Sequence, residues 1–390
     1  MKTYDFDELI NREGTNSVKY DGRPHFFGQK DVLPLWVADM DFKAPDFIVE
    51  AIRSRAQHEI YGYTFRPESY NEAIVHWLKT RHNWEIQKEW IHFSPGVVPS
   101  LAFSVMCFTE PGDSVIVQPP VYFPFFSAVK NNGRELIENP LRLENGRYFM
   151  DFEDLEKKIQ ADTKMLLLCN PHNPGGMAWT KKELQKLSRI CTENNILVVS
   201  DEIHSDLIFR GFKHTPFALV SEESALNSIT CMAPSKTFNI AGLSTSFLVI
   251  PNKKIFDKYD NLMKATQLYG GNIFGAVALE AAYTKGADWL DQMMAYIEGN
   301  YTFVEQFLGE NIPQIVPIKP EATYLVWLDF SALGLKDADI NSRLIKAGVG
   351  LNRGIQFGRQ GKGFMRLNLG CPRSILTEAL GRMKKEFAGE

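Results

Sequence analysis

The sequence has few cysteines, and it lacks a long hydrophobic run. Its five cysteines are scattered over 390 residues and never form a Cys-x-x-Cys pair. This excludes a disulfide framework and a zinc site, and it predicts reduced thiols in a cytoplasmic protein. No apolar run approaches the roughly 18 residues of a membrane span. The stretch Met1 to Asp7 lacks the apolar core of a signal peptide.

An excess of one charge is also lacking. The chain carries 43 Lys and Arg against 47 Asp and Glu, a formal net charge of −4. This balance gives no reason to expect nucleic acid or an anionic membrane as a partner. The sequence does have enough apolar residues for a large hydrophobic core, since 44% of its residues are hydrophobic and 12% are aromatic. That content excludes disorder, and the length predicts about two domains.

Short apolar runs alternate with helical patterns through the middle of the chain. Runs of four to six such residues are typical of strands buried on both faces of a parallel-rich sheet. They lie at 114–117, 165–169, 196–200 and 245–250. Between them, Thr180 and Glu183 form a capping-box pattern that opens an amphipathic helix to Cys191. This alternation predicts an α/β domain of about 240 residues.

The C-terminal part has a different pattern. A helical stretch over 288–308 precedes two strand-like segments at 324–329 and 363–368. We expect a smaller α+β domain here, completed by the N-terminal segment. The predicted boundaries are 48–286 for the large domain, and 1–47 together with 287–390 for the small one.

Three polar segments follow predicted strands, namely Asn170 to Gly176, Asp201 to His204, and Ser235-Lys236. Ligands of open α/β sheets collect at the carboxyl ends of the strands, so we expect these segments to share one crevice. A desolvated Lys236 is a nucleophile for an aldehyde. Asp201 would keep a pyridine nitrogen protonated, and Asn173 would donate to a phenolic oxygen. Together they predict a site for pyridoxal 5′-phosphate.

The sequence resembles the MalY/PatB-type cystathionine β-lyases, which are carbon–sulfur lyases of the aminotransferase class I/II superfamily. The resemblance spans about residues 3 to 385. It rests on the motifs at 36–42, 61–64, 94–99, 119–122, 170–176, 201–206, 235–243 and 364–368. It implies the fold-type I architecture: a large domain with a mostly parallel seven-stranded sheet sandwiched by helices, and a smaller α+β domain. It also implies a homodimer with active sites at the interface.

The resemblance assigns most of the cofactor contacts. It implies a phosphate cradle before a helix predicted from Ser100, where backbone amides favour an anion. Tyr122 matches the aromatic that stacks on the cofactor ring. Tyr63 matches a phosphate-contacting tyrosine donated across the dimer interface, and Tyr61 is a near-equal alternative. The remaining implied contacts are Gly96, Val97 and Val98 of the cradle, with Ser235 beside it.

The resemblance also implies how the substrate is held. At two positions, however, the sequence departs from the pattern of many aminotransferases. Arg366 matches the arginine that grips the substrate α-carboxylate. The backbone of Val37 and Ala38 is expected to meet the substrate, as are Tyr122 and Asn173. Many aminotransferases have tyrosine where this chain has His204, which is expected to keep contact with the cofactor region. Many have a phosphate-gripping arginine where it has Ser244.

The implied reaction is β-elimination of a small sulfur amino acid such as L-cystathionine, giving homocysteine, pyruvate and ammonia. L-Cysteine and cystine are further candidate substrates. Lys236 would remove the α-proton, and either Lys236 or Tyr122 would protonate the leaving thiolate. An aminotransferase that shares the early steps is the alternative enzyme. A regulatory binding protein that retains the lyase fold is the alternative without catalysis.

Overall fold

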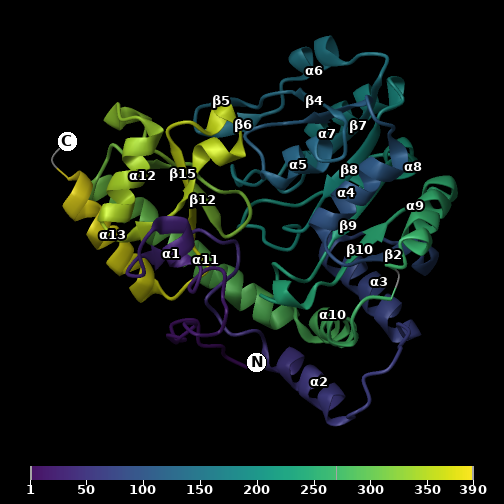
Figure 1. Ribbon diagram of the computed structural model, residues 1–390, viewed down its shortest axis with the longest axis horizontal. Helices are drawn as coiled ribbons and strands as arrows, with labels where there is room; N and C mark the ends of the chain where they lie inside the picture. The colour runs from purple at the N-terminus through teal and green to yellow at the C-terminus, as the bar shows by residue number, and fades with distance from the viewer. Residues whose placement is uncertain (1, 269, 389–390) are drawn as a thin grey trace.

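A seven-stranded sheet forms the centre of the molecule in the computed structural model, which describes residues 2–268 and 270–388 (Figure 1). The strand order is β2-β10-β9-β8-β7-β3-β4, and only β10 runs antiparallel to its neighbours. The strands are β2 (Ile91–Ser94), β3 (Ser114–Val117), β4 (Glu135–Glu138), β7 (Thr163–Cys169), β8 (Leu197–Asp201), β9 (Ser228–Met232) and β10 (Ser246–Val249). The predicted parallel-rich sheet is confirmed.

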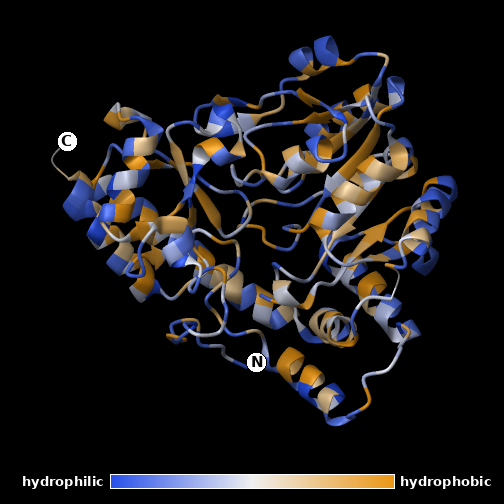
Figure 2. Ribbon diagram, in the orientation of Figure 1, coloured by the Kyte–Doolittle hydropathy of each residue, from blue (hydrophilic) through white to orange (hydrophobic). Residues whose placement is uncertain are grey.

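Alternate side chains of these strands enter two different cores. Met165, Leu167 and Cys169 of β7 pack on one face, while Leu166 and Leu168 pack on the other. Both faces are therefore apolar, which explains the continuous hydrophobic runs. The strands of this sheet stand out as hydrophobic against the helices that surround them (Figure 2). One core includes helices α4 (Val97–Phe108), α5 (Pro124–Lys130) and α9 (Lys253–Ala265), and the other α6 (Phe152–Lys158) and α7 (Lys181–Glu193).

The C-terminal region builds a second, four-stranded sheet in the order β11-β12-β15-β14. Its strands are β11 (Val316–Pro317), β12 (Leu325–Asp329), β14 (Asn352–Arg353) and β15 (Phe364–Asn368). The helices of this region are α11 (Ala287–Asn311), α12 (Asp337–Lys346) and α13 (Arg373–Phe387). The N-terminal segment joins it, because β1 (Leu33–Pro34) pairs with β13 (Val349–Gly350).

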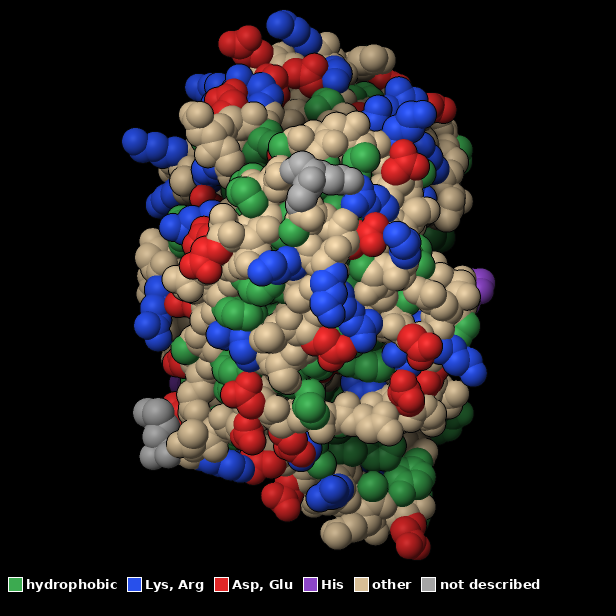
Figure 3. Space-filling view, turned by 90° about the vertical axis from the view of Figure 1, so that its left-hand side faces the viewer, with side chains coloured by type: hydrophobic (Ala, Val, Ile, Leu, Met, Phe, Trp, Pro, Cys, Tyr) green, Lys and Arg blue, Asp and Glu red, His purple; other side chains and the backbone are tan. Residues whose placement is uncertain are grey.

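The remaining elements lie around these two sheets. They are α1 (Arg23–Phe27), α2 (Asp46–Gln57), α3 (Glu68–His82), α8 (Glu222–Leu226), α10 (Ile273–Lys285), and the hairpin β5 (Arg142–Glu144) and β6 (Arg147–Phe149). Within residues 2–268 and 270–388, no helix is both long and apolar enough to span a bilayer. On the face formed around α12 and α13, cationic and anionic side chains alternate without a continuous patch of one sign (Figure 3).

Element bounds differ from the sequence-based expectation at a few ends. The capping box of Thr180 and Glu183 is present, and the helix it opens continues to Glu193. The helix expected from Ser100 begins at Val97 instead. That prediction was wrong because Pro99 lies in the first turn of the helix, where proline needs no hydrogen-bond donor. The long helix expected over 288–308 extends to Asn311.

Candidate active site

The parallel strands bring the three predicted polar segments to one edge of the sheet. Asp201 is the last residue of β8 and pairs in register with Cys169 at the end of β7. The segment from Asn170 follows β7, and Lys236 follows β9. Because β7, β8 and β9 are adjacent and parallel, their carboxyl ends meet there.

The Lys236 amine points toward the segment that follows β1. Its Nζ donates a hydrogen bond of 2.6 Å to the backbone oxygen of Ala38. Burial lowers the pKa of this amine to about 8, against the opposing effects of the Asp39 and Asp201 carboxylates. A larger neutral fraction near neutral pH is what a nucleophilic or basic lysine needs.

Asp201 is a buried carboxyl group that has no cationic hydrogen-bond partner among residues 2–268 and 270–388. Its Oδ1 accepts from the backbone amide of Ile203 at 3.1 Å. Burial raises its pKa to about 7, although that amide and the Lys236 charge act in the opposite direction. A buried carboxyl group in this state is stabilised by any cation that hydrogen-bonds to it. A protonated ring nitrogen meets that requirement.

Arg366 lies on β15 and is almost fully buried. Its guanidinium donates to three neutral oxygens: Asn173 Oδ1 at 3.0 Å, the Trp36 carbonyl at 2.9 Å and Asn352 Oδ1 at 2.6 Å. Its Nε is buried and has no hydrogen-bond partner within the described residues. Burial lowers the pKa of this guanidinium to about 10. A buried cation that contacts only neutral groups is a ready site for a carboxylate.

The N-terminus of α4 lies directly after β2 and is not capped by a side chain. Gly96 occupies the N-cap position, and Val97 and Val98 are the first two helical residues. An uncapped N-terminus presents backbone N–H groups and the positive end of the helix dipole to an anion. The start of α4 therefore has a local structure that can receive an anion, as the predicted phosphate cradle requires.

Three further predicted residues surround the same region. The backbone of Tyr122 donates to the Asn173 carbonyl at 3.1 Å, and burial raises the pKa of its phenol. His204 is buried with Nδ1 unpartnered in the described chain. Burial and the positive charges of Lys236 and Arg366 lower the pKa of His204 to about 3, so its ring is neutral. Ser235 is half-buried beside Lys236.

Tyr63 is not brought into this cluster. It is fully exposed on the segment between α2 and α3, which runs along the outside of the molecule (Figure 1). The hydroxyl of the alternative candidate, Tyr61, donates to the Ala56 carbonyl at 2.7 Å. Both side chains are exposed, Tyr63 fully and Tyr61 by about half.

Sequence reasoning missed four residues that shape the site. Tyr324 and Lys236 donate to the same carbonyl, that of Ala38. Asn368 donates to the carbonyls of Val37 and Asp39, which holds the predicted substrate-facing backbone in place. Asn352 contacts Arg366, and the Asp39 carboxylate acts on the Lys236 charge. A signal existed for Asn368, which lies two residues beyond Arg366 and therefore on the same face of the strand.

Among residues 2–268 and 270–388, no group of three or more His, Cys, Asp and Glu side chains is placed to hold a metal ion.

Fold and site together define an α/β protein whose candidate site residues meet at the carboxyl edge of a mostly parallel sheet. A profile of the aminotransferase class I and II family matches residues 30–383. Cystathionine beta-lyase PatB of Bacillus subtilis (strain 168) is 49% identical over 381 residues, which is 97% of this chain and 98% of PatB.

Two solved structures are similar over nearly the whole chain. A putative aminotransferase from Clostridium difficile 630, crystallised with bound PLP, is 48% identical with a TM-score of 0.97, covering 99% of this chain and 100% of its own. Cystalysin from Treponema denticola, which contains pyridoxal 5′-phosphate, is 40% identical with a TM-score of 0.96, covering 99% of each chain. The chain belongs to the aminotransferase class I and II family, and the predicted resemblance and fold are confirmed.

Proposed function

We propose that the protein is a pyridoxal-phosphate-dependent carbon–sulfur lyase acting on L-cystathionine and related sulfur amino acids. The observation that carries the proposal is the convergence of a lysine with a lowered pKa, a buried carboxyl group and a buried arginine that contacts only neutral oxygens. The lyase name of PatB, a relative of nearly half identity over almost the full length, supports the same conclusion.

The residues of the site fit the cofactor. When bound, pyridoxal phosphate supplies an aldehyde that takes the substrate amine and a ring that accepts electrons from the α-carbon. Lys236 would hold its aldehyde, Asp201 its ring nitrogen and Asn173 its phenolic oxygen. Tyr122 would cover the ring, with His204 near its edge. The uncapped start of α4 at Gly96, Val97 and Val98, together with Ser235, would receive the phosphate.

Arg366 orients the substrate. Its guanidinium would exchange neutral oxygen partners for the α-carboxylate, giving charge-assisted and bidentate bonds. The carbonyls of Val37 and Asp39 are fixed by Asn368, and the Ala38 carbonyl by Tyr324, so the backbone facing the substrate is already in place. Fixed partners of this kind reduce the entropic cost of aligning the reacting bonds.

Lys236 is the base and then the acid of the reaction. In the neutral form, its amine takes the α-proton and becomes an ammonium ion. The carbon–sulfur bond breaks, and the sulfur leaves with the bonding electron pair. The ammonium ion is a stronger acid than Tyr122, whose phenol pKa is raised by burial, so we assign the protonation of the thiolate to Lys236. With one water, cystathionine yields homocysteine, pyruvate and ammonia.

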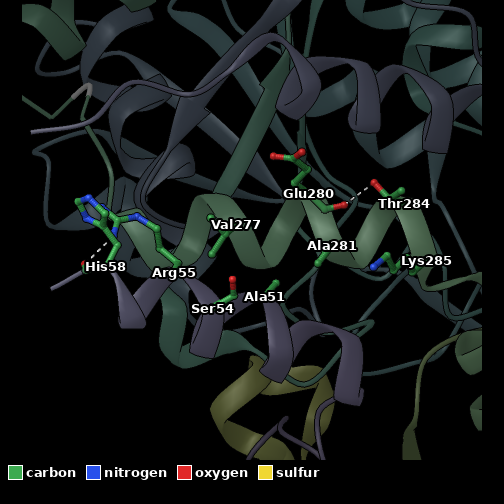
Figure 4. Close-up of a pocket in the computed structure, with 9 residues that line it drawn as sticks. All are labelled: Ala51, Ser54, Arg55, His58, Val277, Glu280, Ala281, Thr284 and Lys285. Carbon is green, nitrogen blue, oxygen red and sulfur yellow. Dashed lines mark hydrogen bonds between the residues drawn. The ribbon is translucent and has the colours of Figure 1, made fainter. Parts of the chain in front are cut away.

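The complete enzyme is proposed to be a homodimer. The connection after α2 exposes Ile60, Tyr61, Tyr63 and Phe65, which is unusual for a monomer surface. Beside it, α2 and α10 border a cleft of about 710 Å³ whose lining includes Ala51, Val277 and Ala281 (Figure 4). A second copy would cover this surface, and its Tyr63 would reach the phosphate of the neighbouring site.

We also propose the predicted division into a cofactor-binding domain (48–286) and a small domain (1–47 with 287–390). It is supported by the two separate sheets, whose strands lie within residues 91–249 and 316–368. A cytoplasmic location is proposed because all five cysteines are free thiols.

The test is pyruvate release from L-cystathionine by the purified enzyme without added keto acid. We expect pyruvate and homocysteine in equal amounts, and a visible absorption band that borohydride abolishes. Lys236→Ala should lose covalent attachment of the cofactor and turnover. A strict requirement for a keto acid, with no free pyruvate, would instead make the protein an aminotransferase.

A further inference from the structure

The hydroxyl of Tyr324 lies close to the reacting amine. It donates a hydrogen bond of 3.0 Å to the Ala38 carbonyl, and Lys236 Nζ donates 2.6 Å to the same oxygen. Because both groups donate to the same oxygen, the phenol hydroxyl and the amine lie next to each other. No role assigned above to Lys236, Asp201 or Arg366 explains a buried phenol at this position.

The position of Tyr324 is firmly set by the small-domain sheet. Its ring is 1% exposed, and its carbonyl accepts from the Leu369 amide at 2.8 Å. It directly precedes β12, where Leu325 pairs with Asn368 and Trp327 with Arg366. Tyr324 therefore comes from the same two paired strands as the arginine and is held with similar rigidity.

Several charged or titratable groups surround the phenol and the amine. Asp39 and Asp201 favour the ammonium form of Lys236, and Arg366 opposes it. The His204 ring contacts the Tyr324 ring edge to face, with centroids 6.1 Å apart. Burial raises the pKa of the Tyr324 phenol well above its ordinary range, as does the nearby Asp39 carboxylate. The phenol therefore remains a hydrogen-bond donor at every working pH.

We propose that Tyr324 is a positioning residue for the Lys236 amine: by donating to the Ala38 carbonyl, it fixes the oxygen that holds the amine whenever the amine is not bonded to the cofactor. The inference rests on the proposed role of Lys236 as base. During that interval the amine must stay beside the α-carbon, and a four-carbon side chain without an anchor would explore many rotamers. The anchored carbonyl restricts it to one.

The hydroxyl also tunes the amine. A carbonyl oxygen that already accepts one hydrogen bond is a weaker acceptor for a second donor. Removing the phenol hydroxyl would make the Ala38 carbonyl a stronger acceptor and so favour the charged ammonium form. While the amine is free, the carbonyl stays bonded to Lys236. In the resting holoenzyme, where Lys236 would be bonded to the cofactor, the change leaves one backbone acceptor without this donor and should lower stability modestly while the fold is kept.

The central test is Tyr324→Phe in the holoenzyme, with Tyr301→Phe as the matched control. Tyr301 is also buried, and its hydroxyl donates to Glu305 within α11 at 2.7 Å. For Tyr324→Phe we expect kcat on cystathionine to fall about five- to ten-fold with KM within two-fold, since one hydrogen bond is lost and substrate contacts are kept. The deuterium isotope effect at the α-carbon should rise. Tyr301→Phe should match wild type.

A second readout does not depend on turnover. The enzyme is depleted of cofactor, and the rate at which added pyridoxal phosphate restores the visible band is followed against pH. In wild type this rate should rise through about pH 8, where the Lys236 amine loses its proton. In Tyr324→Phe the midpoint should lie at higher pH and the plateau rate should be lower.

A double variant separates positioning from direct chemistry. In Lys236→Ala assayed with added methylamine, Tyr324→Phe should cost less than two-fold, because the amine that it positions is absent. The proposal fails if Tyr324→Phe lowers kcat as much in the Lys236→Ala background as in wild type. It also fails if the single variant changes only KM, or if it changes neither kcat nor the rate at which added pyridoxal phosphate restores the visible band. A loss confined to poor leaving groups, with S-(o-nitrophenyl)-L-cysteine unaffected, would overturn it too, because it would make Tyr324 the leaving-group acid. Cofactor that stays covalently bound in Lys236→Ala would instead refute the proposed function itself.

Discussion

Replacing Arg366 tests the assignment of the substrate carboxylate site most directly. The guanidinium is buried, and among the described residues its hydrogen bonds all go to neutral oxygens, so a bound carboxylate would be an anionic partner that the chain itself does not provide there. A hydrogen bond to a charged group contributes about 1.5–3 kcal/mol. Two such bonds in a bidentate pair therefore contribute about 3–6 kcal/mol, which corresponds to about 10²- to 10⁴-fold in kcat/KM.

We expect Arg366→Met to lower kcat/KM for cystathionine by this factor of about 10² to 10⁴. Arg366→Lys should lose less, about 10- to 100-fold, because it keeps the charge but not the two-pronged geometry. The matched control is Arg353→Met on the neighbouring strand β14, whose guanidinium pairs with Asp337 instead. It should stay within three-fold of wild type.

A binding measurement accompanies the kinetics. Propionate, a carboxylate without an amine, should raise the thermal midpoint of wild type with the logarithm of its concentration once that exceeds its Kd, and it should not do so in Arg366→Met. If Arg366→Met keeps kcat/KM within ten-fold of wild type, or if propionate stabilises both proteins equally, the carboxylate is held elsewhere and the reasoning fails.

Two predictions concern stability. Thr237→Val removes a 2.8 Å bond to the buried Asp206 carboxylate and should lower the free energy of unfolding in urea by about 1.5–3 kcal/mol; no change would show that solvent replaces the bond. Burial lowers the pKa of His172 to about 3, so below its unfolded pKa of 6.5 only the unfolded chain gains that proton, and stability falls as pH falls. Relative to His172→Asn, wild type should therefore lose about 1.4 kcal/mol between pH 7.5 and 5.5; a pH-independent difference would contradict a neutral buried ring.

Much of the fold and part of the site could be predicted from local sequence. The runs at 114–117 and 165–169 predicted β3 and most of β7, because a strand buried on both faces must be apolar throughout. Lys236, Asp201 and Asn173 could be grouped because each follows a strand, and parallel strands end at one edge. The chemistry of these side chains then predicted the cofactor before any interatomic distance was known.

The rest depended on packing between distant segments. Arg366 and Asn173 are 193 residues apart in sequence, yet they share a hydrogen bond. Tyr324 could not be singled out from the sequence, because a tyrosine before a strand is ordinary core material. Its role depends on the register of β12 with β15, which aims its hydroxyl at Ala38.

The sequence by itself predicted most of the side chains that are proposed to carry the chemistry, and most of the elements that bear them. Only the tertiary structure decided which backbone oxygens face the amine and the guanidinium, and which tyrosine hydroxyl bonds within the chain, that of Tyr61 to Ala56. The physical reason is that strand and helix patterns depend on neighbouring residues, whereas hydrogen bonds such as that from Lys236 to Ala38 depend on how two distant segments are packed together.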